Sequence, residues 1–326
     1  MSTSPPVQVL LATYNGERFL RQQIESILAQ TYTPLQILAR DDGSQDGTRA
    51  ILEEYASASP ERFMLMPLDA ATGGSKWNFV RLLQAATAEY VALADQDDVW
   101  LPDKISREME AMQGLERKNG VEKPLLVFSD LRIVDDALWT KFESLREHQG
   151  IEPASIHELR RILSQNVVTG CTALLNRPLV QLATRMPAEA FMHDWWIALL
   201  ACSFGDATAM PEPTVLYRQH GANVLGAGTV RRVSGAPVWR QHGLRREQWE
   251  MTVVQAQGML RVHASELTVQ QRDLLRAYVR CETSSNRFVR VSTWLSHGFF
   301  PNGLRAILAR LWYLWDMDAA KRELVD

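Results

Sequence analysis

The stretch "VQVLLATYNGERFLRQQIESILAQ", residues 7–30, decides the fold. It begins with the short apolar run VQVLLAT, which is typical of a buried strand. After Asn15, apolar side chains recur at helical spacing and fall on one stripe: Phe19, Leu20, Ile24, Ile27 and Leu28. We therefore predict a strand that is followed directly by an amphipathic helix.

The same alternation continues along the chain. Strands are predicted within residues 35–41, 62–68 and 89–95, and helices within residues 48–59, 76–88 and 102–118. Residues 124–136 read as a further pair of strands, and from about residue 245 the pattern is almost wholly helical. Strands that alternate with helices predict an α/β fold, with a mostly parallel sheet flanked by helices and a C-terminal helical region. A cluster of glycines predicts a boundary between residues 1–226 and 227–326.

The composition narrows the class of protein. The chain has 326 residues, 46% of them apolar, and a net charge of −3 without a basic tail, so no nucleic-acid partner is expected. No apolar run approaches the roughly 18 residues that cross a bilayer, and the first residues do not resemble a signal peptide. The three cysteines are far apart and predict reduced thiols in a cytoplasmic protein.

Polar side chains gather where the predicted strands end. Asn15 follows the first strand, Asp42 the second, and the sequence "ADQDD", with Asp95, Asp97 and Asp98, the fourth. Ligands of parallel α/β sheets bind at the carboxyl ends of the strands. Crowded carboxylates call for a compensating positive charge, and a divalent cation such as Mg²⁺ takes one or two carboxylates together with phosphate oxygens.

Other nucleotide and metal motifs are missing. No GxGxxG or GxxxxGK[ST] follows a strand, which excludes the dinucleotide fingerprint and the P-loop. The turn "DDGSQDGT" lacks the glutamate that completes a calcium loop, because Leu52 stands at that position. A plain structural alternative is that its aspartates cap the helix at Thr48.

Two later motifs add candidate functional groups. In "FMHDWW", Asp194 is either a helix-capping carboxylate or a base beside two tryptophans, Trp195 and Trp196, that form an apolar wall or a stacking platform. In "VLYRQHG", Arg218 and His220 follow a predicted short strand; His220 could complete a metal shell and Arg218 could pair with phosphate. A lone histidine is more often an ordinary surface or core residue, so this assignment depends on the neighbouring aspartates.

Together these residues resemble a known family. The segments "LLATYNGERFLRQQIESILAQTY", "ARDDGSQDGT", "ADQDDVWLPDKI", "HDWW" and "YRQHGANVLG" occur in this order between residues 10 and 226. They resemble the family 2 inverting glycosyltransferases of the GT-A fold, and most closely the bacterial rhamnosyltransferase-like members that build O-antigen and other cell-surface polysaccharides.

The resemblance implies a role for each matching residue. Asp97 would be the metal ligand of the DxD motif for Mg²⁺ or Mn²⁺, His220 would ligate the metal or contact the diphosphate, and Asp194 would be the catalytic base. The family usually has Glu-Asp at this last position, but His193 replaces the glutamate here. The expected nucleotide-sugar contacts are Thr13, Tyr14, Asn15, Asp42, Lys76, Asn78, Asp95 and Arg218. Asp98 is a less certain third carboxylate and could instead cap the helix after Pro102.

The implied chemistry is a single-step sugar transfer. The base deprotonates the acceptor hydroxyl while the metal stabilises the leaving nucleoside diphosphate. The resemblance points to dTDP-rhamnose as donor, then a UDP-sugar, and to a polysaccharide or polyprenyl-diphosphate-linked acceptor. The QxxRW signature of processive synthases is absent, which favours single additions. Two alternatives are a sugar-phosphate nucleotidyltransferase and a non-catalytic module that binds nucleotide sugars.

The C-terminal region has its own pattern. Helical spacing places apolar residues on one face: Leu304, Ile307, Leu308, Leu311, Trp312 and Trp315. This face predicts packing on the catalytic domain or on a homodimer partner, or else contact with the inner membrane surface. Arg305, Arg310, Lys321 and Arg322 would then lie near lipid head groups. A second basic cluster is either simply solvated or contacts a lipid-diphosphate acceptor or the donor diphosphate: Arg231, Arg232, Arg240, Arg245 and Arg246.

Overall fold

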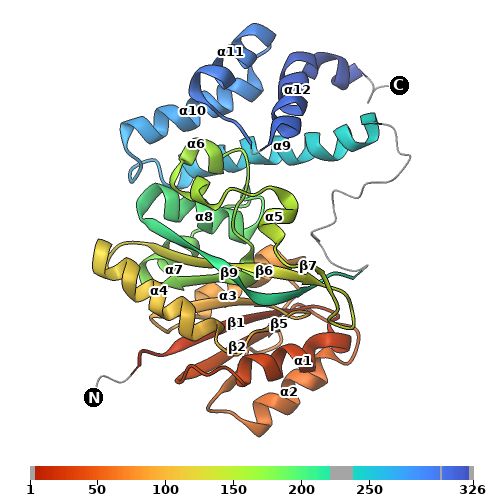
Figure 1. Ribbon diagram of the computed structural model, residues 1–326, viewed down its shortest axis with the longest axis vertical. Helices are drawn as coiled ribbons and strands as arrows, with labels where there is room; N and C mark the ends of the chain where they lie inside the picture. Colours follow the sequence, from red (N-terminus) through yellow and green to blue (C-terminus); the bar gives the residue numbers. More distant parts are fainter. Residues whose placement is uncertain (1–3, 221–237, 302, 323–326) are drawn as a thin grey trace. The chain divides into compact units, whose positions relative to one another are not determined.

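The computed structural model describes residues 4–220, 238–301 and 303–322, and the side chains of residues 4–220, 249–301, 303, 304 and 306–315. The chain forms two compact units (Figure 1). The first consists of residues 1–149, 168–186 and 192–230, and the second of residues 150–167, 187–191 and 231–326. A single boundary at residue 226 did not anticipate that residues 150–167 and 187–191 join the C-terminal helices.

In the described part of the chain, nine strands form one mixed sheet within the first unit. The order is β3-β2-β1-β4-β8-β6-β9-β5, and β7 pairs with β6. The strands are β1 (Val7–Thr13), β2 (Leu35–Asp41), β3 (Phe63–Leu65), β4 (Tyr90–Asp95), β5 (Val99–Trp100), β6 (Leu125–Val134), β7 (Thr140–Phe142), β8 (Ala173–Asn176) and β9 (Asp206–Arg218).

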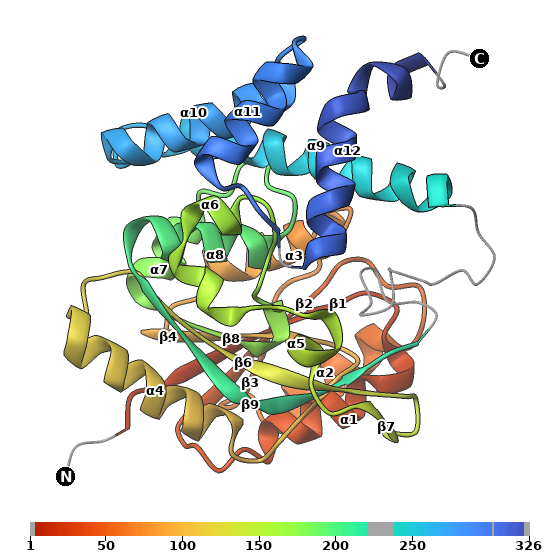
Figure 2. The same ribbon diagram turned by 45° about the horizontal axis from the view of Figure 1, so that its top comes forward.

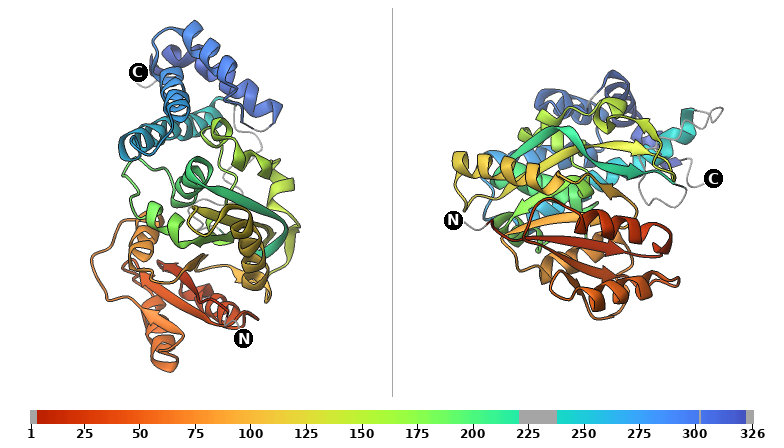
Figure 3. Two further views of the ribbon diagram at one scale, coloured as in Figure 1. Left: turned by 90° about the vertical axis from the view of Figure 1, so that its left-hand side faces the viewer. Right: turned by 60° about the horizontal axis from the view of Figure 1, so that its bottom comes forward.

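The N-terminal half of this sheet is parallel, as the alternating pattern predicts. β1 lies between β2 and β4 and is parallel to both, and its register sets Thr13 opposite Asp41 and Ala12 opposite Asp95. The carboxyl ends of these three strands therefore meet at one edge of the sheet. In both views of Figure 3, β1 and β2 lie beside the helices α1 (Glu17–Leu28) and α2 (Thr48–Ala58).

Helices cover both faces of the sheet (Figure 2). On one face, α1, α2 and α4 (Lys104–Asn119) pack apolar side chains such as Leu20 and Met109 against alternate strand residues such as Val9 and Ile37. The other face carries α3 (Ser75–Ala85), α7 (Arg177–Ala183) and α8 (His193–Phe204). Burial on both faces explains why β1 reads as a continuous apolar run rather than an alternating one.

Two elements differ from the sequence prediction. Residues 124–136 were predicted to contain two strands, but Leu125–Val134 is one continuous strand, with register shifts around Asp130 where it runs beside β9. The strand before His220 was predicted to be short, but β9 spans thirteen residues and carries prolines at positions 211 and 213. Polar residues interrupt the apolar pattern of β6, and prolines interrupt that of β9, so the sequence did not indicate how long each strand is.

The second unit is helical. It contains η1 (Pro153–His157), α6 (Leu159–Ile162), α9 (Val238–Val262), α10 (Val269–Thr283), α11 (Arg287–His297) and α12 (Leu304–Arg322), while α5 (Leu145–Gln149) and η2 (Gly170–Thr172) belong to the first unit. α10 begins with a capping box made by Thr268 and Gln271. Arg310 is buried and ion-paired with Glu282 at 2.5 Å, so the prediction that Arg310 faces lipid is wrong. Among the described residues, no helix is long and apolar enough to span a membrane.

Candidate active site

A carboxylate and an imidazole, both of which are common metal ligands, lie together at the edge where the strands end. Asp97 stands in the turn after β4, and His220 follows β9, 123 residues later. The Nε2 atom of His220 lies 2.9 Å from Oδ2 of Asp97, and the Phe19 ring packs 5.0 Å from the imidazole. Burial raises the pKa of Asp97, while His220 acts against that rise. A carboxylate oxygen and an imidazole nitrogen at one point suit Mn²⁺ or Mg²⁺.

Arg218 holds this turn in place. Its side chain is buried, and its guanidinium donates to the backbone oxygens of Asp97 and Asp136 and to Oε1 of Gln22. Its backbone N–H donates to Asp98 at 3.2 Å. Arg218 is only 1% exposed, and all three nitrogen atoms of its guanidinium donate hydrogen bonds to protein groups. The guanidinium therefore faces the protein interior rather than solvent.

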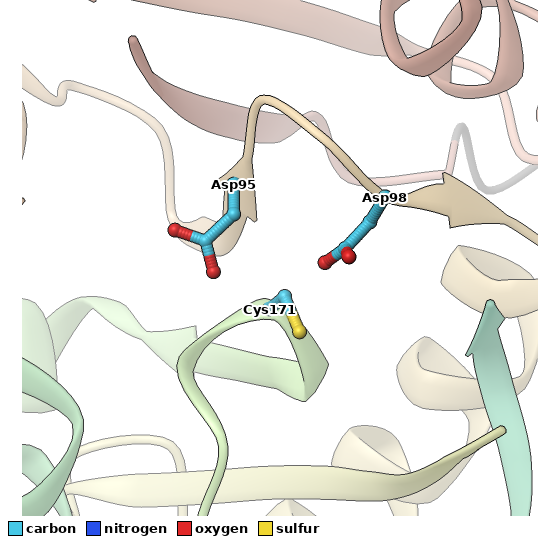
Figure 4. A group of neighbouring side chains, drawn as sticks. All are labelled: Asp95, Asp98 and Cys171. Carbon is cyan, nitrogen blue, oxygen red and sulfur yellow. The ribbon is translucent and has the colours of Figure 1, made fainter. Parts of the chain in front are cut away.

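Two further carboxylates and a thiol lie beneath the metal pair. The side chains of Asp95 and Asp98 point toward one space that Cys171 also faces (Figure 4), and their donor atoms lie within 4.8 Å of one another. Burial and the charge of Asp97 raise the pKa of Asp95 to about 7 and hold that of Asp98 well above its ordinary range. Burial likewise raises the pKa of the Cys171 thiol, which donates a hydrogen bond to Asp98.

The position of Asp98 rules out its predicted capping role. Its side chain is completely buried, and α4 starts at Lys104 after Asp103, which makes no side-chain cap. A protonated thiol is a soft donor that suits Mg²⁺ and Mn²⁺ poorly. Asp98 and Cys171 therefore fit a buried hydrogen-bonded support better than they fit the coordination shell of a hard ion.

Asp194 lies in the first turn of α8. The helix is capped by Met192, and Asp194 accepts hydrogen bonds from the backbone N–H groups of Trp195, at 2.6 Å, and of Gly170. Burial raises the pKa of Asp194 to about 6 despite these bonds. Its charge also raises the pKa of Asp95, which places the two carboxylates within one electrostatic site.

The residues around Asp194 form a packed wall. His193 is buried, stacks on Phe79 with ring centroids 4.0 Å apart, and has its pKa lowered to about 3 by burial. It is therefore neutral at ordinary pH. Trp196 is fully buried and Trp195 is 8% exposed, so neither offers the open stacking platform that we considered from the sequence.

The loop after β1 presents an exposed aromatic ring. Tyr14 is 55% exposed, whereas Thr13 is buried and donates from its hydroxyl to Asp41 at 3.2 Å. Asn15 takes up a left-handed conformation with φ of 49° and bonds to Ser44 and Gln45 in the loop after β2. These contacts bind the two strand-end loops to each other.

Asp42 faces inward rather than toward open solvent. It accepts hydrogen bonds from Arg40, from both the backbone and the hydroxyl of Thr72, and from the backbone of Gly74. Burial alone would raise the pKa of Asp42, but these hydrogen bonds outweigh it and hold the pKa below its ordinary value. Asn78 is also buried; it accepts from Arg40 and donates to the carbonyl of Thr13.

The remaining predicted contacts are less enclosed. Lys76, at the start of α3, is partly exposed, and its ammonium lies 4.8 Å from the centroid of the Trp77 ring. Sequence reasoning missed Gln96, Cys171 and Arg40, each of which contacts predicted site residues. Gln96 was visible as the residue between Asp95 and Asp97, but nothing in the sequence signalled the contacts of Cys171 and Arg40.

Comparison with known proteins finds glycosyltransferases. Residues 8–120 match the family model described as Glycosyl transferase family 2. The dTDP-rhamnosyl transferase RfbG of Shigella flexneri is 27% identical over 250 residues, which cover 73% of this chain and 80% of that protein. Over residues 8–120, the chain is therefore similar to the family 2 glycosyltransferases.

Solved structures show that this chain has the GT-A fold. The structure of TarS from S. aureus superposes with a TM-score of 0.55 at 14% identity, covering 96% of this chain and 53% of that one. The mannosyltransferase PcManGT from Pyrobaculum calidifontis, solved with GDP-Man and Mn²⁺, gives a TM-score of 0.50 at 16% identity, covering 99% and 84% of the two chains. A shorter TarS structure, residues 1–349, contains UDP-GlcNAc and gives a TM-score of 0.53 at 15% identity, covering 92% of this chain and 81% of that one.

Proposed function

We propose that this chain is a glycosyltransferase that depends on a metal ion and inverts the anomeric configuration of the sugar that it transfers. The observation that carries the proposal is the convergence of the Asp97–His220 pair and the partly buried Asp194 at one edge of the sheet. The pair supplies donors for a divalent ion, and Asp194 supplies a base. An inverting transfer needs these two functions and no nucleophilic carboxylate.

The metal would be Mn²⁺ or Mg²⁺, held by Asp97 and His220. When bound together with the donor, the ion would act as a Lewis acid that neutralises charge on the leaving diphosphate. Asp95 lies beside this pair, and its pKa is raised first by burial and then by repulsion from Asp97, which a cation would relieve. We assign Arg218 to the positioning of the Asp97 turn, because its guanidinium already binds the backbone of that turn.

Asp194 would act as the catalytic base. A pKa of about 6 leaves its carboxylate ionised at neutral pH and closer to the acceptor hydroxyl in basicity than an exposed aspartate would be. In the transfer, the acceptor oxygen forms a bond to the anomeric carbon, the bond from that carbon to the diphosphate oxygen breaks, and the hydroxyl proton moves to Asp194. The neutral His193 beside it adds no competing charge.

The nucleotide would occupy the surface formed by the loops after β1 and β2. Tyr14 offers an exposed ring for the base, and Thr13 and Asn15 shape the loop beneath it. Asp42 and Asn78 anchor residues 69–74 and the ends of β1 and β2, and Lys76 is the cation available for the diphosphate side. In this proposal, Asp42 gives up the hydrogen bonds that it accepts from Thr72 and accepts hydrogen bonds from the bound donor instead.

We propose dTDP-rhamnose as the donor, with UDP-sugars as the next candidates. The similarity to the dTDP-rhamnosyl transferase RfbG over most of both chains supports the first choice, and the complex of TarS with UDP-GlcNAc supports the second. The acceptor would be a cell-surface polysaccharide, such as O-antigen, or a polyprenyl-diphosphate-linked glycan at the inner face of the cytoplasmic membrane.

A donor screen tests the proposed substrate class. With Mn²⁺ present, a true donor raises the melting temperature by mass action, and turnover releases its nucleoside diphosphate. We expect a dTDP- or UDP-sugar to do both. Binding without release of nucleoside diphosphate in the presence of acceptor extracts would indicate a non-catalytic module, and no shift with any nucleotide sugar would refute the proposal.

The second unit offers a surface for approaching a lipid-linked acceptor. α12 exposes Leu304, Leu308, Trp312 and Trp315 along one stripe, and Phe288 of α11 packs edge-to-face on Trp315 at 5.4 Å. Residues 231–326 contain 15 Lys and Arg against 9 Asp and Glu, although the whole chain has a net charge of −3. We propose that this face lies on an anionic membrane. The side chains of Arg231, Arg232, Arg240, Arg245, Arg246, Arg305, Lys321 and Arg322 lie outside the described residues.

Vesicle binding tests the membrane proposal. We expect the wild-type chain to co-sediment with anionic phosphatidylglycerol vesicles and the Trp312→Ser/Trp315→Ser variant to bind at least several-fold less. Trp139→Ser is the matched control, because Trp139 is 77% exposed in the first unit. Unchanged vesicle binding in the double variant would contradict the proposal, and a concentration-dependent dimer lost in the double variant would assign the face to a second copy of the chain.

A further inference from the structure

A side-chain amide between the two aspartates of the DxD motif holds the loop that carries Tyr14. Oε1 of Gln96 accepts a hydrogen bond from the Tyr14 backbone N–H at 2.7 Å, and Nε2 of Gln96 donates one to the Tyr14 carbonyl at 2.9 Å. Both backbone groups of Tyr14 are thereby satisfied by one side chain. The pairing joins residues 82 positions apart in the sequence.

Gly16 makes room for this pairing. A Cβ atom on Gly16 would lie 2.2 Å from Oε1 and 2.4 Å from Cδ of Gln96. The φ of Gly16 is −106°, which other residues also adopt, so the backbone conformation does not demand glycine here. A Cβ at this position would instead push the flexible Gln96 amide aside, so glycine preserves the pairing between Gln96 and Tyr14.

The two hydrogen bonds are poorly placed to stabilise the fold. Gln96 is partly exposed and Tyr14 is 55% exposed, so water competes for both bonds. Hydrogen bonds that replace bonds to water add little net stability. What the pairing does fix is geometry, because Tyr14 presents its ring from a backbone that is tied to the turn between Asp95 and Asp97.

We propose that Gln96 is a positioning residue for donor binding, acting through Tyr14. This inference rests on the proposed function. The Gln96 amide couples the side of the site that would hold the nucleotide base, at Tyr14, to the side that would hold the diphosphate, at Asp97. Without the amide, the exposed ring of Tyr14 must be ordered when the nucleotide binds, and affinity falls by the cost of that ordering.

Binding and kinetics of Gln96→Ala test the proposal. We expect the Kd for dTDP or UDP, whichever the wild-type chain binds, measured by calorimetry with Mn²⁺ present, to rise about tenfold, in line with the cost of ordering the Tyr14 side chain on binding. The donor KM should rise by a similar factor while kcat changes less than about threefold. The melting temperature should match that of Gln113→Ala, a control in which an exposed glutamine of α4 is removed.

Gly16→Ala provides a second route to the same defect. Its methyl group should displace the Gln96 amide and weaken nucleotide binding to the same extent as Gln96→Ala, and the double variant should be no weaker than either single one. Gln96→Glu keeps an acceptor for the Tyr14 N–H but loses the donor to the Tyr14 carbonyl, so its nucleotide affinity should fall by an intermediate factor.

Three outcomes overturn the positioning role. These are an unchanged Kd in Gln96→Ala, a fall in kcat without a change in KM, and additive losses in the double variant. If the wild-type chain binds no nucleoside diphosphate with Mn²⁺ present, the proposed function fails first, and the inference fails with it. Normal wild-type binding with an unaffected Gln96→Ala variant rejects the inference alone.

Discussion

Asp194 should be costly to the folded state and indispensable to transfer, and Asp194→Asn separates these two effects. Burial raises the pKa of Asp194 from 3.8 to about 6. One pKa unit corresponds to about 1.4 kcal/mol, so holding the ionised carboxylate in its site costs at most about 3 kcal/mol. Partial exposure of the side chain reduces this figure.

The sign of the pH dependence follows from the direction of that shift. Because the pKa is higher in the folded state, the folded protein binds the proton more tightly, and Asp194 lowers the free energy of unfolding as pH rises from about 4 to about 6. Asparagine cannot ionise, and its side-chain oxygen can still accept the N–H bonds of Trp195 and Gly170. The unfolding free energy of Asp194→Asn relative to wild type should therefore rise by about 1 to 2 kcal/mol between pH 5 and pH 7.5.

Urea denaturation of the metal-free proteins at these two pH values measures the difference. A transfer assay on the same samples should show a loss of at least about a hundredfold in kcat, with nucleotide binding retained. His193→Gln serves as a neighbouring control whose relative stability should not follow the same pH course. If Asp194→Asn shows no gain in relative stability with pH, the carboxylate is not held ionised at a cost. Near-normal turnover would remove Asp194 as the base.

The site supports three further predictions. Asp97→Asn and His220→Ala should each weaken Mn²⁺ binding, measured by electron paramagnetic resonance with nucleoside diphosphate present, by at least about tenfold; unchanged Mn²⁺ binding in both variants would exclude the pair as ligands. Cys171→Ala should change Mn²⁺ affinity less than about twofold, because a protonated thiol suits this ion poorly; a large loss would move the metal to the Asp95 side of the site. The kcat at saturating donor should rise with pH around a midpoint near 6, because Asp194 must be ionised; a rate independent of pH between 5 and 7 would argue against that role.

The alternation of strands and helices along the chain, and the edge of the sheet that holds the candidate site, could be predicted from the sequence. The apolar runs that end at Thr13, Asp41 and Asp95 were each followed by polar turns, and parallel pairing necessarily brings such turns together. The meeting of Asp97 with His220, 123 residues later, was implied by the family resemblance and not by strand pairing.

What could not be predicted depended on tertiary partners. The sequence does not show whether a charged residue in a motif faces solvent or is bound by other protein groups. Arg218 and Asp42 both form hydrogen bonds with residues far away in the sequence, Gln22 and Thr72. The tryptophans after Asp194 were ambiguous for the same reason, because only the packing of α8 shows that Trp196 is buried. The membership of residues 150–167 in the second unit carries no local signal at all.

The stereochemistry of transfer tests the central claim most directly. Proton NMR can follow the sugar released to water, in the presence of Mn²⁺, from whichever nucleoside-diphospho-sugar the chain turns over. The proposed mechanism predicts that the first sugar to appear has the anomeric configuration opposite to that of the donor, that EDTA stops its release, and that Asp194→Asn does not produce it. Release with the donor's configuration, or at an equal rate in EDTA, would contradict a metal-assisted inverting transfer at Asp97, His220 and Asp194.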